Sequence, residues 1–270
     1  MKLASILVAT HHRPDLLEKV LLHLRLMTIP KGWQVEILVG GTPDDPSKER
    51  ASANAVYLDV PDDRVTVKLN ALLEIARGEL ILLADDDDIQ PPNRLEAAIK
   101  AHEEGADWAG SGNLWFYHIN ADRLTFWSGP SHLGLVGTSL SFRTELLRQV
   151  GGWPLHAKGK DAPLAAKLQS VGAKYQDLTA NLEHNLIALQ HGANLWDRPA
   201  LDKGQTAQKG NFIIQGYGSL AENPTRFHPQ VQATLRALQQ PDTRNRIGAQ
   251  AQRIYAVTGN RPWVPSLAEG

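Results

Sequence analysis

Leu80-Ile81-Leu82-Leu83-Ala84-Asp85-Asp86-Asp87-Asp88 is the stretch of sequence that decides the fold. Its first five residues form an apolar run that is too short for a helix, so it predicts a strand buried on both faces. Four consecutive aspartates follow, and like charges this close raise one another's pKa. A buried strand that ends in such a cluster indicates a ligand site at the carboxyl edge of a parallel sheet.

Short apolar runs alternate with helical patterns on the amino-terminal side of this strand. The further strands predicted there are residues 5–9, 35–39 and 56–58. Between them, apolar residues recur at helical spacing from Leu16 to Leu24 and from Leu69 to Ala76. Gly78 is expected to end the second of these helices as a left-handed cap. The alternation predicts an α/β fold with a Rossmann-like, doubly wound and mostly parallel sheet.

The pattern changes after a helix expected at residues 92–104. Residues 114–119 and 123–127 are rich in aromatic side chains and predict an antiparallel hairpin. A strand at 139–142, helices at 144–150 and from Asp161, and a stretch of little periodicity beyond residue 199 come next, followed by helical patterns at 230–240 and 244–257. We therefore expect one domain over residues 1–199, with halves 1–105 and 106–199, and a helical extension over residues 200–270.

Charge and composition exclude several classes of protein. The chain has 270 residues, with 28 Lys and Arg against 29 Asp and Glu, so its charge as a whole attracts neither nucleic acid nor anionic lipid. It has no cysteine, which excludes disulfides, thiolate metal sites and cysteine nucleophiles and fits a cytoplasmic location. No apolar run approaches the roughly 18–20 residues of a transmembrane helix. We expect the short apolar start to be a strand and not a signal peptide.

Two loops at predicted strand ends carry candidate site residues. The four aspartates could hold a hard divalent ion such as Mg²⁺ or Mn²⁺, or they could form a solvated loop that caps the next helix. Thr10, His11, His12 and Arg13 follow the first strand, where an imidazole and a guanidinium could meet a nucleotide. The two histidines could instead bind metal or lie on the surface.

The order of these sequences resembles family 2 glycosyltransferases of the GT-A fold. The donor half of that family is matched by residues 5–14, 36–39, 68–70 and 76–88, and the acceptor half by residues 139–143, 150–153 and 159–164. The resemblance covers roughly residues 3–195. It implies an inverting transfer of sugar from a nucleotide-diphosphate sugar, with a UDP- or GDP-sugar as donor, Mn²⁺ or Mg²⁺ as cofactor, and a glycan, lipid-linked or polymeric acceptor.

The resemblance also implies roles for individual residues. The residues implied to bind the nucleotide sugar are Thr10, His11, Arg13, Lys68, Asn70, Asp85 and Asp86. The implied metal ligands are Asp87, Asp85 and His191, with His184 as the alternative to His191. Asp161 matches the aspartate of the ED motif, which is the base for the acceptor hydroxyl in inverting members. From the residues alone, Asp161 could equally be the N-cap of a helix.

The chain departs from the family pattern at two places. Gly40-Gly41 stands where the family commonly has an Asp-Asp pair, and Lys160 replaces the glutamate of the ED pair. These departures keep open a non-catalytic module that binds a nucleotide sugar or a glycan. A nucleotidyltransferase would need a glycine-rich loop after the first strand, which residues 10–15 lack. Four aromatic residues of the hairpin, Trp115, Phe116, Tyr117 and Trp127, could be core or could stack on an acceptor.

Overall fold

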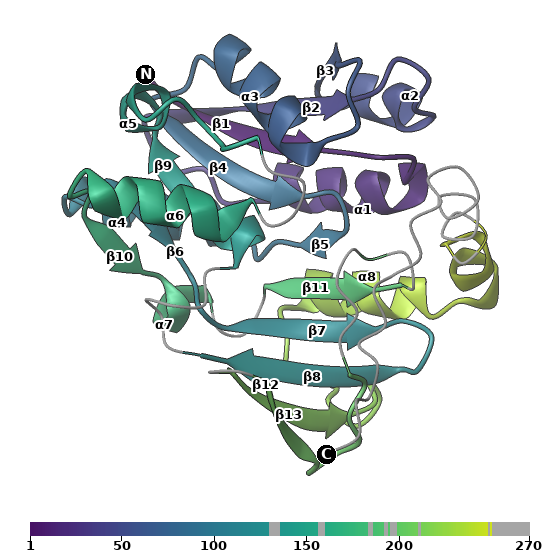
Figure 1. Ribbon diagram of the computed structural model, residues 1–270. Coiled ribbons are helices and arrows are strands. Elements are labelled where there is room, and N and C mark those ends of the chain that lie inside the picture. Colours follow the sequence, from purple (N-terminus) through teal and green to yellow (C-terminus); the bar gives the residue numbers. More distant parts are fainter. Residues whose placement is uncertain are drawn as a thin grey trace.

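Two sheets with flanking helices make up the fold (Figure 1). The computed structural model describes residues 1–129, 136–155, 160–182, 186–191, 194, 199–209, 212–247 and 249. In this part of the chain the first sheet has seven strands in the order β10-β6-β9-β4-β1-β2-β3. The second sheet lies below it in Figure 1 and has six, in the order β12-β13-β8-β7-β11-β5.

The centre of the first sheet is parallel, as the sequence predicts. Its strands are β1 (Lys2–Ala9), β2 (Trp33–Gly41), β3 (Val56–Asp59) and β4 (Leu80–Asp85). β1 lies between β2 and β4, with Ile6 opposite both Ile37 and Leu82. Beyond β4, the short strands β9 (Ser141–Arg143) and β6 (Trp108–Gly110) pair antiparallel, and β10 (Tyr175–Asp177) joins β6 in parallel.

Helices cover both faces of this sheet, because successive side chains of β1 and β4 point to opposite faces. Leu17 and Leu21 of α1 (Pro14–Arg25) and Ile99 of α4 (Arg94–Glu103) pack on one face. The other face is covered by α3 (Val65–Ile75), α5 (Thr144–Gln149) and α6 (Asp161–Ser170). The doubly wound α/β prediction is therefore confirmed, and the carboxyl ends of β1, β2 and β4 share one edge.

The remaining elements are short or belong to the second sheet. α2 (Ser47–Ser52) and α7 (Thr179–Leu182) are brief helices, and Gly137–Ser139 forms a 3₁₀ turn where the sequence predicted the start of a strand. The second sheet contains β5 (Asp88–Ile89), β7 (Leu114–His118), β8 (Arg123–Ser128), β11 (Ile187–Gln190), β12 (Thr206–Lys209) and β13 (Phe212–Gly218). The predicted hairpin is the β7–β8 pair, with Trp115 opposite Phe126.

Residues 206–218 differ from the helical extension expected there. They form a β-hairpin, and β13 pairs antiparallel with β8 of the second sheet. The helix α8 (Pro229–Leu238) then packs Val231 and Leu235 against the same core cluster as Trp115 and Ile187. Segments on both sides of residue 199 thus share one apolar core, and the domain boundary at 199 stays a prediction.

Gly78 does not have the role predicted for it. α3 ends at Ile75 with an extended residue, Ala76, after it, and Gly78 has no positive φ. A side chain at Gly78 would instead collide with β1, because its Cβ would lie 2.5 Å from the backbone nitrogen of Ser5. The glycine is needed for this close approach of the two backbones.

The aromatic residues of the hairpin belong to the core. Trp115 and Tyr117 face the α8 side, while Phe116 and Trp127 pack together on the opposite side of the sheet. All four are buried, so they provide apolar packing and not an open acceptor platform. Within the described residues, no helix has both the length and the apolar character needed to cross a membrane.

Candidate active site

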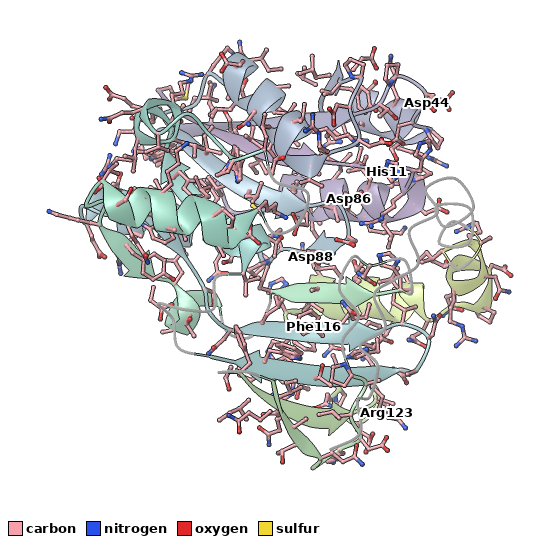
Figure 2. All side chains as sticks on the ribbon, in the orientation of Figure 1. His11, Asp44, Asp86, Asp88, Phe116 and Arg123 are labelled. Atoms are coloured by element: carbon pink, nitrogen blue, oxygen red, sulfur yellow. The ribbon has the colours of Figure 1, made fainter. Side chains whose placement is uncertain are left out.

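The candidate site lies at the carboxyl edge of the first sheet, where β4 runs into β5. Figure 2 shows Asp86 and Asp88 between the two sheets, with His11 close to Asp86 at the end of β1. Of the four aspartates, Asp86, Asp87 and Asp88 are only 5%, 9% and 6% exposed. A solvated loop is therefore wrong, and the aspartates do not cap α4, which begins after Asn93.

Asp86 joins the ends of β1 and β4. Its Oδ2 accepts hydrogen bonds from the Thr10 hydroxyl at 2.9 Å and from the His11 backbone N–H at 3.3 Å. Its Oδ1 accepts from Arg13 Nη1 at 2.9 Å. Burial nevertheless raises the pKa of Asp86, with the Arg13 charge acting in the opposite direction. The structure thus brings three predicted donor-binding residues together around Asp86.

Asp87 is a member of the cluster that its neighbours keep ionised. Its Oδ2 accepts from Arg13 Nη1 at 2.7 Å and lies 3.1 Å from His191 Nε2. Burial acts to raise the pKa of Asp87, but Arg13 and His191 hold it at about 2. The side chain of Asn194 also donates to Oδ2, at 3.3 Å. Asn194 was given no role from the sequence, although it stands only three residues after His191.

The pKa of Asp88 is shifted in the opposite direction to that of Asp87. Burial and the neighbouring charges of Asp87 and Asp85 raise the pKa of Asp88 well above its usual value. Neighbouring carboxylates in one buried cluster cannot all ionise without opposing charge. Within the cluster, the pKa of Asp87 is therefore lowered and that of Asp88 is raised.

Lys160 contributes a positive charge to the cluster. Its Nζ lies 2.6 Å from Asp85 Oδ1, and its side chain is 15% exposed. Burial acts to lower the pKa of Lys160, but the charges of Asp85 and Asp161 raise it well above its usual value. Lys160 is therefore a permanent cation at the position where the family resemblance implies a glutamate.

Asp161 is the first residue of α6 and lies beside this ion pair. Lys160 occupies the N-cap position of the helix and makes no side-chain cap hydrogen bond, so Asp161 is not the N-cap. Burial raises the pKa of Asp161 to about 6, with Lys160 lowering it and Asp85 raising it. Its buried Oδ1 has no hydrogen-bond partner among the residues that the structure describes. The carboxylate lies against Gly137. A Cβ at position 137 would collide with both carboxylate oxygens, so the glycine leaves the space that Asp161 occupies.

The side chains of Lys68 and Asp63 lie at the end of β1, close to His11. Lys68 is buried and donates from Nζ to the backbone oxygen of Thr10 at 2.9 Å. The ring of His11 lies 3.2 Å from Asp63 Oδ1 through its Nδ1. Burial and the nearby Lys68 charge lower the pKa of His11. The sequence analysis gave Asp63 no role, because no sequence pattern indicates that Asp63 lies close to His11 in the fold.

Gly41, the last residue of β2, has a structural explanation. A Cβ at Gly41 would lie 2.2 Å from the hydroxyl oxygen of Tyr57, which donates to the backbone oxygen of Thr42 at 3.0 Å. Tyr57 on β3 thus fills the space that a side chain at position 41 would need. Asp45 is also committed to the backbone, since it accepts from the N–H groups of His12 and Ser47 at 2.8 Å each.

Asn70 is not brought to the cluster. Its side chain makes two hydrogen bonds of 2.8 Å with the backbone of Trp153, which tie α3 to the segment before α6. The alternative metal ligand His184 lies outside the described residues. The structure therefore brings most of the predicted site residues into one cluster, while Asn70 joins two segments of the fold.

The residues present fit a divalent cation that is shared with a substrate. In the described part of the chain, no three His, Asp or Glu side chains converge as a metal site. Asp87 and His191 do converge, and their 3.1 Å separation matches the roughly 3 Å between adjacent ligands of an octahedral ion with bonds of about 2.1 Å. Mg²⁺ in particular is usually held by one or two carboxylates together with substrate phosphates.

The doubly wound sheet, the second sheet at its edge and the aspartates between them define a GT-A type fold. The structure of TarS from S. aureus with UDP-GlcNAc is similar, with a TM-score of 0.55 and 15% identity over 96% of this chain and 73% of that one. PcManGT, a mannosyltransferase from Pyrobaculum calidifontis solved with GDP-Man and Mn²⁺, gives 0.53 and 16% over 96% and 76%. TarS with UDP gives 0.51 and 19% over 70% and 60%.

The sequence itself gives the family. The profile described as glycosyl transferase family 2 matches residues 5–151, which is more than half of the chain. The protein therefore belongs to glycosyl transferase family 2, and this prediction from the sequence is confirmed. No curated protein matches the chain significantly. The chain spans only 60% of the TarS structure with UDP.

Proposed function

We propose that the protein transfers a sugar from a nucleotide-diphosphate sugar to a hydroxyl acceptor, with inversion at the anomeric carbon. The observation that carries this proposal is Asp161, a buried carboxyl with a pKa of about 6 beside Asp85, one of whose oxygens has no hydrogen-bond partner within the described part of the chain. A general base works best when its pKa is near the working pH. Asp161 is ionised at neutral pH and can accept the proton that the acceptor hydroxyl loses as it attacks.

Asp87 and His191 are the residues that would hold a divalent cation. Such an ion would act as a Lewis acid and neutralise the charge that develops on the leaving diphosphate. Arg13 keeps Asp87 ionised and in place, and Asn194 donates to the same carboxylate oxygen. The four side chains therefore prepare one anionic position at the end of β4. The presence of Mn²⁺ in the PcManGT structure supports this assignment.

The donor is proposed to be a UDP- or GDP-sugar. TarS has been solved with UDP-GlcNAc and PcManGT with GDP-Man, which supports a donor of this class without choosing the base. His11, with its ring against Asp63 at the end of β1, is our candidate for the contact with the nucleotide. The acceptor is proposed to be a glycan, a lipid-linked sugar or a polymer, and a cytoplasmic location stays a prediction from the absence of cysteine.

The test is a panel of UDP-, GDP-, CDP-, ADP- and dTDP-sugars with and without Mn²⁺. We expect one donor to raise the melting temperature in the presence of Mn²⁺, since a ligand at 100 times its dissociation constant adds about 2.7 kcal/mol. The same donor should release nucleoside diphosphate slowly by transfer to water. Binding without release would favour the non-catalytic module, and no binding by any donor would contradict both.

Asp87→Asn is the variant that tests the cation position. Asparagine keeps the size of the side chain but removes the charge, so we expect the Mn²⁺-dependent part of donor binding to be lost. Asp202→Asn is the control, since Asp202 is an exposed carboxylate that pairs with Arg123 on β8. Undiminished Mn²⁺-dependent binding by Asp87→Asn would show that the cation is held elsewhere.

A further inference from the structure

The outer side of α1 carries apolar side chains that the fold leaves exposed to solvent. Leu22 and Leu26 are 48% and 42% exposed, whereas their neighbours Leu21 and Leu24 are only 1% and 3% exposed. Because Leu22 and Leu26 are four residues apart, they lie on the same face of the helix. Ile29, three residues further along the chain, is 49% exposed. We call Leu22, Leu26 and Ile29 the α1 stripe.

The apolar surface continues from the stripe into a groove at the amino edge of the first sheet. The groove has a volume of about 570 Å³ and is lined by the apolar side chains of Leu3, Ile29, Trp33 and Val35. Arg77 and Glu36, which also line it, pair with each other at 2.7 Å. Ile29 therefore joins the exposed side of α1 to an apolar groove beyond the end of the helix.

Both acidic residues of α1 are paired with cations from elsewhere in the chain. Asp15 Oδ2 lies 3.8 Å from Nε of Arg246, which follows α8 in the sequence. Glu18 Oε1 lies 3.3 Å from Nη1 of Arg50 on α2. The acids of α1 therefore add little net negative charge to its outer side.

The cations beside the stripe have no such partners. Lys19 and Arg25 stand three residues before and after Leu22, which makes them its neighbours on the helix surface. Arg25 donates to the neutral side chain of Asn54, and within the described chain neither Arg25 nor Lys19 has a carboxylate at ion-pair distance. Lys31, shortly after the stripe, is exposed and has no acidic partner in that part of the chain either.

An apolar stripe flanked by unpaired cations selects one kind of partner. A second copy of this chain would bring the same cations face to face, and like charges repel each other. Nucleic acid would attract the cations but would leave the leucines without apolar contacts. A membrane with anionic headgroups satisfies both parts, because its acyl region takes up apolar side chains and its phosphates attract Lys and Arg.

We propose that the outer side of α1, with its stripe and with Lys19, Arg25 and Lys31, docks the protein on the surface of a membrane that contains anionic phospholipid. α1 begins directly after Arg13 of the candidate active site, whereas Leu26 follows the other end of the helix. The docking surface is thus separate from the aspartate cluster. The inference does not rest on the proposed function.

Co-sedimentation with unilamellar vesicles tests this proposal. The full chain is mixed with vesicles of phosphatidylcholine alone, or of phosphatidylcholine and phosphatidylglycerol in equal parts. We expect the wild type to bind the mixed vesicles at least tenfold more tightly than the neutral ones and to lose this preference at high salt. Leu22→Ser with Leu26→Ser should bind the mixed vesicles at least tenfold more weakly than the wild type. Lys19→Gln with Lys31→Gln should lose most of the preference for them.

Val171→Ser with Ile213→Ser is the matched control, because these side chains are 55% and 58% exposed, directly after α6 and on β13. It removes a similar apolar area from other surfaces and should bind vesicles as the wild type does. The proposal is overturned if the wild type binds both kinds of vesicle equally or binds neither, and the second result would favour an acidic protein as the partner. It is also overturned if either double variant of the α1 surface, shown to be folded by circular dichroism, binds like the wild type.

Discussion

Four identical residues in a row, Asp85 to Asp88, have four different environments. Asp85 is paired with Lys160, and Asp86 accepts from the end of β1. Asp87 lies between Arg13 and His191, which keep its pKa at about 2, whereas burial and like charges raise the pKa of Asp88 well above its usual value. The neighbours supplied by the fold, and not the residue type, decide which carboxyl can carry a charge.

The first prediction concerns Asp161. Asp161→Asn keeps the size of the side chain but cannot accept a proton, so turnover should fall by about 10²–10⁴-fold while donor affinity stays nearly unchanged. In the wild type, activity should fall as the pH drops through about 6, where Asp161 takes up a proton. Steady-state kinetics and donor titration check both statements.

Stability distinguishes this role from a structural one. Because α6 has no side-chain cap hydrogen bond, Asp161→Ala should not show the loss of about 1 kcal/mol that removal of an N-cap causes. Asp202→Asn serves again as the exposed control. Wild-type turnover by Asp161→Asn would remove Asp161 from the mechanism.

At the scale of elements, a contact between β1 and the segment before β4 links the central strands of the first sheet. Ser5 is fully buried and donates to Glu36 Oε1 on β2 at 2.6 Å, while the N–H of Gly78 donates to the Ser5 hydroxyl at 2.9 Å. The backbone N–H of Arg77 donates to the same Glu36 oxygen at 2.7 Å. One polar network thus joins the three central strands at the end opposite the site.

The second prediction is that Gly78→Ala destabilises the protein by about 1–3 kcal/mol or more, as overpacking does. Its Cβ would meet the backbone of Ser5 at 2.5 Å, and backbone cannot turn away as a side chain can. Gly172→Ala is the control, since it has a positive φ but nothing within 4 Å of the added Cβ. Urea unfolding of both variants should show the larger loss for Gly78→Ala, and an equal or smaller loss would refute the collision.

At the scale of the molecule, the carboxyl-terminal elements complete the second sheet and its core. α8 packs against β7 and β11, and its Thr234 hydroxyl lies 2.7 Å from Nε2 of His23 on α1. Gln239, just after α8, donates to the hydroxyl of Tyr117 on β7. The tail therefore joins the amino-terminal helix to the second sheet.

The third prediction follows from this packing. A chain that ends at residue 240 keeps β12, β13 and α8, and it should fold with a lower melting temperature because the buried Ile247 is lost. A chain that ends at residue 199 would expose the faces of Trp115 and Ile187 and should be insoluble or lack cooperative unfolding. A soluble, cooperatively folded 1–199 chain would support the boundary predicted from the sequence.

The fourth prediction is that acid weakens the protein through buried histidines. Burial and the charge of His228 lower the pKa of His23 to about 4, below the value of about 6.5 expected when unfolded. Between these values the unfolded state binds a proton that the folded state does not, so stability is full above pH 6.5 and falls toward pH 4.

Urea unfolding at pH 7 and pH 5 measures this effect. His23→Gln cannot titrate in this range, and its loss of stability between the two values should be about 2 kcal/mol smaller than that of the wild type. His102, whose pKa is lowered to about 4 mainly by burial, offers a second position with the same sign. An identical pH dependence in His23→Gln and the wild type would contradict the assignment.

The sequence by itself determined the four parallel strands of the first sheet and the family, and it predicts a site at the carboxyl edge of those strands. Apolar runs such as residues 80–84 and 5–9 are local signals, because a strand buried on both faces needs apolar residues throughout its length. The acidic run and the loop after β1 fall at the same edge once the strands are parallel. The aspartates and Arg13 are therefore expected at one edge, whereas His191 is implied there only by the family resemblance.

Only the tertiary structure decided which side chains contact each other in the aspartate cluster and which sheet the carboxyl-terminal segment joins. The Lys160–Asp85 pair, the Asp63–His11 contact and the pairing of β13 with β8 join segments far apart in the chain. Residues 206–218 carry only a weak periodic pattern, which does not predict strands. They form strands because β13 can pair with the edge of β8. Ion pairs and strand pairing depend on the distance between groups in space. The spacing of residues along the sequence does not give that distance for segments that are far apart in the chain.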